Sequence, residues 1–476
     1  MPLILPGNVA SATADAGYNV ANSCRFNSGD SAYMHKTPGG AGNRRTFTIS
    51  VWVKRTKLGA NQFIISAGPD GNSQAMLKFR SDDTLFLGNQ ISGSMDESFI
   101  TNRVFRDCSA WYHIVCSFDT TDGTEGDRTK IYINGVQETS FSTEDQPAQN
   151  YDWHFNLDQI HEIGKEVAGS NYFDGYMAEF VGIDGTAYAA SDFGEFDEDS
   201  PTIWKPKDVS GLTFGTNGFY LDFEASDNLG NDANGGTDLT EVNLAATDQS
   251  IDVPTNNFPT MNILQVGTAN WVFTEGNLHV AIPSSTNWKS IYSTFGAANG
   301  KWYYEVKVSG NFATGIGLMG GTLDNHASLN GSDSDGYNHA DVWRYRRNGS
   351  SAYYSVGSTS TEIDTVPADD DIIGIAYNAD AGLLYSSING SWQNSATIAE
   401  IAAGTTTNAL FDDITTGVTF AIFGSTENAD NLQYNFGNPV HSISSANADG
   451  NGYGSFEYAV PGNFFALCTK NLAEYG

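Results

Sequence analysis

Short runs of alternating apolar and polar residues, separated by glycine- and asparagine-rich turns, limit most strongly how this chain can fold. Residues 47–53 and 130–133 alternate with a period of two, which is typical of a strand with one apolar face and one polar face. Asn134-Gly135 follows the second run and predicts a type I′ hairpin turn. With 51 glycines and only 17% charged residues, the composition favours many short strands joined by turns.

The same pattern returns in the second half. Residues 301–308 alternate, and the runs 370–377 and 383–390 flank a turn cluster at 378–382, which predicts a hairpin. A single hydrophobic core rarely serves more than about 300 residues, so a chain of 476 residues is expected to form more than one. We therefore predict an all-β chain of two consecutive antiparallel β-sandwich domains of the jelly-roll type.

Turn-rich interruptions of the alternating pattern predict four regions. They are a sandwich with an N-terminal arm at 1–222, an ordered connector at 223–262, a second sandwich at 263–441 and a C-terminal extension at 442–476. Glycine, asparagine and proline interrupt every regular pattern in the connector, while apolar positions such as Leu239 can still be buried.

The charge excludes several classes of partner. The 56 acidic and 23 basic residues give a net charge of −33, which repels phosphate backbones and anionic lipid, so we expect no nucleic-acid partner. The start of the chain has no basic region, and no apolar window approaches a membrane span, so neither a signal peptide nor membrane insertion is expected. The four cysteines show no metal-ligand spacing, which fits synthesis in a reducing cytoplasm.

Two loops contain candidate binding residues. The loop 119–127 offers Asp119, Asp122, Glu125 and Asp127 as oxygen ligands for calcium, although a solvated acidic loop explains the same residues. A second segment concentrates aromatic and basic side chains, which dominate interface energetics. It contains Asp333, Asp335, Tyr337, His339, Trp343, Arg344, Tyr345, Arg346 and Arg347. The alternative is a polar loop that enters a strand whose Trp343 and Tyr345 pack on the core.

Catalysis has little support in the sequence. Glu362-Ile363-Asp364 superficially resembles the carboxylate pair of sandwich glycosidases, but Thr365-Val366-Pro367 supplies no second glutamate. The sequence also has no nucleophile elbow, zinc-binding His-Glu-x-x-His or phosphate-binding glycine loop. We therefore predict a protein that is not an enzyme and has no cofactor, with calcium left as the open alternative.

Four segments of the first half follow one another in a recognisable order: 47–53, Trp111 to Val115, 131–135, and 163–164 followed by 173–180. On these segments the first half resembles the laminin-G-like, concanavalin A-like sandwich family. It implies two curved sheets that bind sugars or proteins, in some members with a calcium ion at the rim.

Five segments of the second half follow one another in a recognisable order: 300–306, 316–318, 371–375, 388–390 and Asn435-Phe436-Gly437. On these segments the second half resembles a SPRY domain, another antiparallel sandwich. The resemblance implies partner recognition through loops at one end of the sandwich, without catalysis.

The tandem arrangement is similar to surface proteins of marine bacteriophage particles. It implies a virion component that is made in the host cytoplasm. The function we favour is a tail-fibre or related appendage that contacts other virion proteins and binds host-surface glycan or protein. Multivalency favours a homo-oligomer, with a trimer expected for a fibre. A capsid decoration or head-fibre subunit is the alternative, and a glycan-active enzyme is the third.

Overall fold

The computed structural model consists almost entirely of antiparallel strands, so the predicted all-β class is confirmed. It describes residues 17–476 except 266–270, 282–288, 310–312, 321–341, 349, 357–358, 364, 416–419 and 428–430. The described residues fall into two compact units, one within Thr13–Thr255 and the other within Asn256–Gly476. Among the described helices, none is long and apolar enough to cross a membrane.

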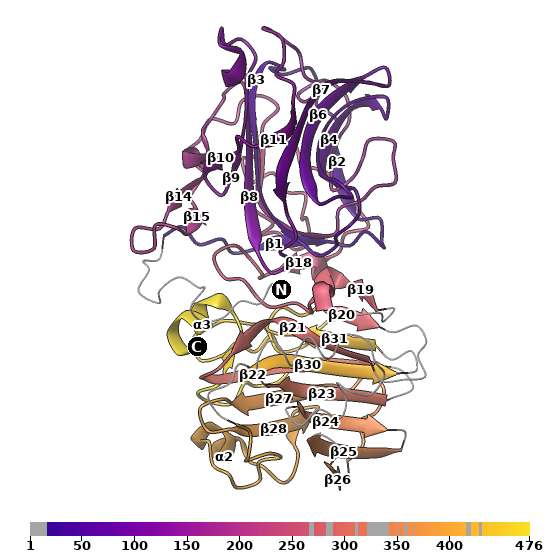
Figure 1. The fold of residues 1–476 in the computed structure, drawn as a ribbon, viewed down its shortest axis with the longest axis vertical. Coiled ribbons are helices and arrows are strands. Elements are labelled where there is room, and N and C mark those ends of the chain that lie inside the picture. The colour runs from indigo at the N-terminus through magenta and orange to yellow at the C-terminus, as the bar shows by residue number, and fades with distance from the viewer. Residues whose placement is uncertain are drawn as a thin grey trace. The chain divides into compact units, whose positions relative to one another are not determined.

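The first unit is a sandwich of two antiparallel sheets, seen in Figure 1 with β3 and β8 in one layer and β4, β6 and β7 in the other. The first sheet has the order β10 (Val136–Gln137), β9 (Thr129–Ile133), β8 (Trp111–Asp119), β3 (Thr46–Arg55), β13 (Gly175–Asp184), β1 (Ser23–Phe26) and β18 (Gln249–Ser250), with β16 (Phe219–Leu221) paired to β13. The second has the order β11 (Phe141–Glu144), β7 (Ser94–Val104), β6 (Thr84–Ile91), β5 (Ser73–Phe79), β4 (Gln62–Asp70), β12 (His161–Ile163), β2 (Tyr33–Lys36) and β17 (Thr240–Val242). A small third sheet pairs β14 (Gly194–Phe196) with β15 (Trp204–Pro206). Short 3-10 turns lie at Glu125–Asp127, Ala190–Asp192 and Ala246–Asp248.

The predicted hairpin at Asn134-Gly135 is present. Ile133 pairs with Val136, and both turn residues have positive φ, 49° at Asn134 and 78° at Gly135. This is the conformation that a type I′ turn requires. A Cβ at Gly135 would lie 2.3 Å from the ring of Trp204, so both conformation and space require glycine there.

The core of the first sandwich is built from the alternating residues, as the pattern indicates. Phe47, Ile49, Val51 and Val53 of β3 face the second sheet and are buried in the main core. The opposite face of β3 is buried as well, although three of its residues, Thr48, Ser50 and Lys54, are polar. Trp52 on this face is only 4% exposed and packs with apolar residues before β1 and after β18, so other segments of the chain cover it.

The first part of the predicted connector completes the first sandwich. Phe223, Leu229 and Leu239 are buried in its main core. Strands β17 and β18 add to the edges of the second and first sheets, respectively. Met261, farther along the predicted connector, is buried in the core of the second unit.

A β-bulge interrupts β13 at a buried carboxyl group. The register against β3 shifts between Ala178 and Val181, and Glu179 within the bulge has a φ of +48°. Bulges redirect side chains in this way. The Glu179 carboxylate accepts hydrogen bonds from the hydroxyls of Tyr220 at 2.7 Å and Tyr18 at 3.3 Å. Glu179 thus connects the first sheet to the arm that precedes β1.

The second unit is also a sandwich of two sheets. One has the order β19 (Val272–Thr274), β20 (His279–Ala281), β31 (Asn431–Asn435), β22 (Lys301–Ser309), β27 (Ile372–Asn378), β28 (Leu383–Ile388) and β29 (Ser391–Trp392), with β32 (Phe465–Ala466) parallel to β22. The other has the order β21 (Lys289–Ala297), β30 (Phe420–Glu427), β23 (Ala313–Met319), β24 (Val342–Asn348), β25 (Ser351–Val356) and β26 (Thr359–Ile363). Helices α2 (Ile398–Ala403) and α3 (Thr469–Tyr475) and the 3-10 turns Ile263–Gln265 and Glu275–Asn277 complete the described elements. The predicted hairpin around 378–382 is the pair β27–β28.

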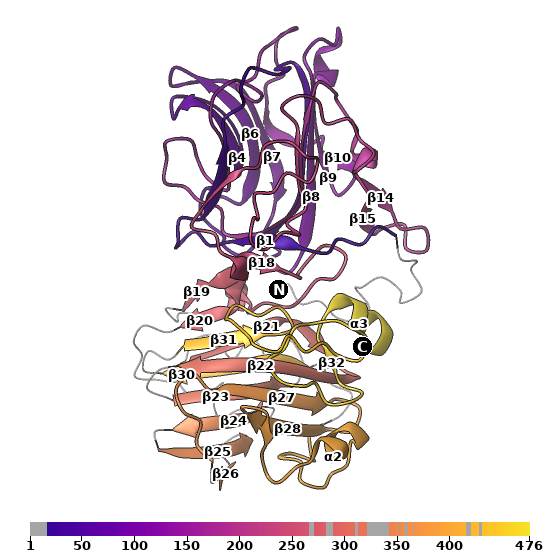
Figure 2. The ribbon, with the colours of Figure 1, turned by 180° about the vertical axis from the view of Figure 1, so that it is seen from behind.

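The C-terminal extension packs on the β22 sheet, with β32 beside β22 in Figure 2. Glu305 of β22 is buried, and its carboxylate accepts the backbone N–H groups of Glu457 at 2.9 Å and Tyr458 at 2.8 Å. The same carboxylate accepts the Tyr303 hydroxyl and the Asn435 amide. Four hydrogen bonds therefore satisfy a carboxylate that would be costly to bury alone.

Glu179→Gln is expected to change the pH dependence of stability. Burial raises the pKa of Glu179 from 4.5 to about 7. The folded pKa lies above the unfolded value, so the fold favours the protonated carboxyl group. The stabilisation from this preference is complete below the unfolded pKa and is lost as the pH rises through about 7. Relative to Glu179→Gln, the wild type should lose about 3 kcal/mol of unfolding free energy across that window. Urea unfolding at a series of pH values measures this, and parallel profiles for the two proteins would contradict it.

Candidate functional site

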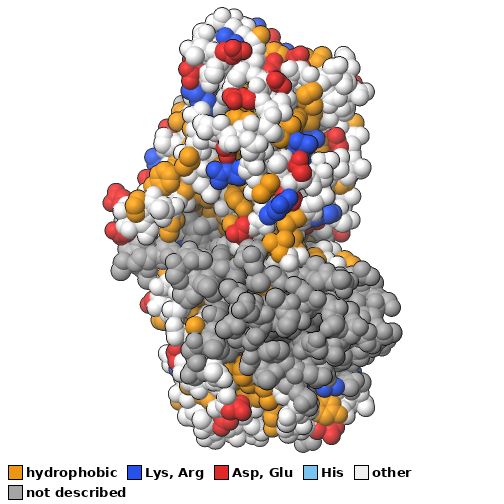
Figure 3. All heavy atoms as spheres, viewed as in Figure 1, with side chains coloured by type: hydrophobic (Ala, Val, Ile, Leu, Met, Phe, Trp, Pro, Cys, Tyr) orange, Lys and Arg blue, Asp and Glu red, His pale blue; other side chains and the backbone are white. Residues whose placement is uncertain are grey.

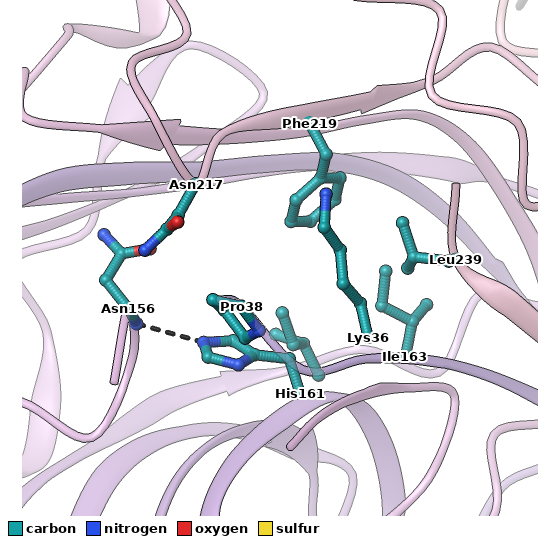
Figure 4. A pocket seen from close by; sticks show the side chains of 9 residues that line it. Lys36, Pro38, Asn156, His161, Ile163, Asn217, Phe219 and Leu239 are labelled. Carbon is teal, nitrogen blue, oxygen red and sulfur yellow. Dashed lines mark hydrogen bonds between the residues drawn. The ribbon is translucent and has the colours of Figure 1, made fainter. Parts of the chain in front are cut away.

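A pocket opens in the first sandwich where β2 and β12 of the second sheet approach β16 of the first (Figure 4). About 340 Å³ of space, open solvent included, lies between its lining side chains, so the recess is small and shallow. Its lining residues come from distant parts of the sequence: Lys36, Pro38, Ile65, Asn156, His161, Ile163, Asn217, Phe219 and Leu239.

The base of the pocket is apolar. Ile65, Ile163, Phe219 and Leu239 are all more than nine-tenths buried and belong to the main core. In Figure 4 Leu239 and Ile163 lie on one side of Lys36, and Pro38, His161 and the two asparagines lie on the other. One side of the pocket therefore offers hydrocarbon, and the other offers amide groups beside a proline and an imidazole ring.

His161 forms part of the wall as a fixed, neutral imidazole. Its Nε2 accepts the backbone N–H of Asn156 at 3.0 Å, and its Nδ1 lies 2.9 Å from the carbonyl of Gln159. A ring that accepts at Nε2 must donate from Nδ1, which assigns the tautomer. Burial lowers the pKa of His161 to about 4. With both nitrogens engaged, His161 holds Asn156 in place.

Asn156 and Asn217 contribute the amide groups. Their side-chain nitrogens donate to the carbonyls of Asn43 at 3.0 Å and Gly40 at 2.9 Å. These bonds orient both amides, and the side-chain oxygens are the ends that can accept from a ligand. Asp184 at the end of β13 accepts the backbone N–H groups of both Asn43 and Asn217, so one carboxylate fixes both loops.

Lys36 is the cation of the pocket, and a buried partner balances its charge. Its ammonium lies 3.7 Å from Oδ2 of Asp232, whose side chain is fully buried, and the Lys36 side chain is 15% exposed. Oδ1 of Asp232 accepts the backbone N–H groups of Tyr220 and Asn234. The pocket therefore presents N–H donors of Lys36 without a net charge.

The predicted calcium ligands are not gathered into a site. Asp119 accepts from the backbone and hydroxyl of Thr121, and Asp127 pairs with Lys130 at 2.8 Å. Asp122 accepts from the backbone of Thr124, and Glu125 is exposed. Across the part of the chain that the structure describes, no group of three His, Cys, Asp or Glu residues could hold a metal ion.

The predicted contact segment of the second unit is only partly described. Asp333, Asp335, Tyr337 and His339 lie outside the described residues. Trp343, Arg344 and Tyr345 are at most 4% exposed within β24. These three therefore leave the predicted contact surface, because alternation along β24 puts Trp343 and Tyr345 in the core.

The remaining predicted residues stay half-buried on the same strand. The Arg346 guanidinium lies 5.5 Å from the centre of the Tyr353 ring, and Arg347 donates to the carbonyl of Pro367. Glu362, considered above for catalysis, is exposed on β26, and Asp364 lies outside the described residues. Figure 3 shows one face of the molecule, and over its described surface the Lys and Arg side chains are dispersed among Asp and Glu.

No local sequence pattern marks the pocket. Lys36, Asn156 and Asn217 share no spacing or motif, and only folding brings them together. Among their neighbours, only Leu239 was expected to be buried.

Comparisons with known proteins support the sandwich resemblance of the first half. Residues 27–185 match the family Laminin_G_3, described as the Concanavalin A-like lectin/glucanases superfamily, which supports the resemblance of the first half. None of the curated proteins searched matches the chain.

Similar solved structures include the TRIM65 PSpry domain, at 11% identity over 37% of this chain and 92% of that chain with a TM-score of 0.29. The SPRY domain of human HERC1 is similar at 12% identity over 33% and 86%, with a TM-score of 0.24. A putative carbohydrate binding protein from Bacteroides ovatus is similar at 17% identity over 47% of this chain and 58% of that chain, with a TM-score of 0.32.

Replacing His161 should remove part of the acid sensitivity of the protein. The folded pKa of about 4 lies below the ordinary 6.5, so the neutral ring stabilises the fold above about pH 6.5, and this is lost as the pH falls through about 4. The unfolding free energy of His161→Gln, obtained from thermal melts, should therefore vary less over this range than that of the wild type, by up to about 3 kcal/mol. Equal acid sensitivity in the wild type and the variant would show that His161 is not responsible.

Proposed function

We propose that this chain is a non-catalytic binding protein whose first sandwich holds part of a glycan in the pocket around Lys36. The observation that carries the proposal is the combination of oriented amides and an ammonium group with an apolar base. Ligand sites commonly place a few fixed polar groups on a mostly apolar surface. Sugars offer both hydroxyl groups and C–H surfaces to such a pocket.

The chemistry of the pocket favours binding over cleavage. Glycoside hydrolysis in most families uses two carboxyl groups on either side of the scissile bond. The lining residues that the structure describes include no Asp or Glu. His161 has both nitrogens engaged, so it is poorly placed to transfer protons to a ligand.

The biological setting that we propose is the surface of a phage particle. Support comes from the resemblance of the tandem sandwiches to marine phage surface proteins. The net charge of −33 favours solubility and disfavours nucleic acid as the partner. In this role the protein contacts other virion proteins, forms a homo-oligomer and attaches the particle to host-surface glycan or protein. Linked weak sites would then raise avidity.

Host-cell binding tests this function. The full-length protein is expected to bind host cells and isolated host polysaccharide without shortening the polysaccharide chains, measured by pull-down and size-exclusion chromatography. Electron microscopy of labelled protein on intact particles gives its location, which is expected at the tail. Shortened polysaccharide would reveal a glycan-active enzyme. Head labelling without cell binding would favour a decoration subunit.

Chelation should leave binding through the pocket unchanged. Its polar contacts come from lysine and asparagine side chains, so a divalent cation is not required. Polysaccharide binding measured with and without EDTA is expected to agree within error. A loss of binding that added calcium restores would point to a different site on this protein.

A further inference from the structure

We propose that the Lys36 pocket recognises the acetamido group of an N-acetylated sugar. This inference rests on the proposed glycan-binding function and names the chemical group that the pocket selects. It follows from three properties of the pocket: its charge balance, its apolar base and its pairing of an N–H donor with amide acceptors.

The charge balance favours a neutral ligand group. The Lys36 ammonium is 3.7 Å from a carboxylate oxygen of Asp232, which is buried and cannot turn away to solvent. An anionic group on Lys36 would compete with that carboxylate, in a chain whose net charge is already −33. A carboxylated or sulfated sugar is therefore a poorer fit than a neutral sugar.

The apolar base favours a methyl group. Ile163 is 1% exposed, Leu239 is 4% exposed and Phe219 is 8% exposed, so what they offer is a small hydrocarbon surface at the bottom of the recess. A hydroxyl group placed there would lose its hydrogen bonds to water without gaining a partner. A methyl group gains contact and leaves no polar atom unsatisfied.

The polar groups suit an amide. The Lys36 ammonium can donate to an amide carbonyl, and the side-chain oxygen of Asn217 or Asn156 can accept an amide N–H. Both asparagines are oriented by bonds to the backbone, so little freedom is lost on binding. Hydrocarbon on one side of Lys36 and amide groups on the other, as in Figure 4, matches the methyl, carbonyl and N–H of an acetamido group.

A ligand series tests the proposal on the full-length protein. The probes are oligomers of N-acetylglucosamine, of glucose and of N-glycolylglucosamine, which carries an added hydroxyl on the carbon that is the methyl of the acetyl group. Calorimetry should give the tightest binding for the N-acetyl oligomer and at least about tenfold weaker binding for the other two. In saturation-transfer NMR, the acetyl methyl protons should receive the strongest saturation. Equal affinities across the series, or weak methyl saturation, would overturn the proposal.

Variants locate the binding. Asn217→Ala removes one amide at the rim and should weaken binding of the N-acetyl oligomer about fivefold. Asn102→Ala removes an exposed asparagine elsewhere in the same sandwich, whose amide donates to Ser140, and should have no effect. Thermal melts confirm that both variants are folded. Equal effects of the two substitutions would exclude this pocket.

The outcomes separate this proposal from the proposed function. If host polysaccharide binds but N-acetyl groups make no difference, the acetamido assignment fails and the binding function stands. If neither the polysaccharide nor any oligomer binds, both fail.

Discussion

Burial of β3 on both faces is the constraint on which the rest of the first sandwich depends. One face of β3 forms the core, and on the other face Trp52 stacks on His113 with ring centres 4.6 Å apart. Nδ1 of His113 accepts the indole N–H of Trp204 at 2.9 Å, so its Nε2 donates to Ser50. Burial lowers the pKa of His113 to about 3, which keeps this ring neutral. The covering layer is thus fixed by specific hydrogen bonds as well as by apolar contact.

The loops at the end of β13 determine the geometry of the pocket. Where β13 stops, Asp184 accepts backbone N–H groups from two loops far apart in the sequence, and those loops orient Asn156 and Asn217. Loops on a rigid scaffold can hold polar groups with little loss of freedom. The core supplies the apolar base because Ile163 and Leu239 reach the edge of the sandwich. One set of contacts therefore stabilises the fold and shapes the pocket.

In the second sandwich, a buried carboxylate holds the segment that covers one sheet. Glu305 lies in the middle of β22 on a face that the C-terminal extension covers. Asp449 acts similarly within the extension: its Oδ2 accepts the backbone N–H of Ala466 and the side-chain amide of Asn471. Buried acidic residues thus hold the C-terminal extension in place. Their hydrogen bonds offset the cost of burial.

Several strands and two of the turns could be predicted from local sequence. Alternation located β3, β22 and the β27–β28 hairpin, and Asn134-Gly135 located the turn between β9 and β10, because these features depend on neighbouring residues. It also left open the packing of Trp343 and Tyr345, which the tertiary structure decided. The same is true of the covered outer face of β3 and of the pocket. Alternation assigns a residue to one face of a strand, but what covers that face depends on contacts between segments far apart in the chain.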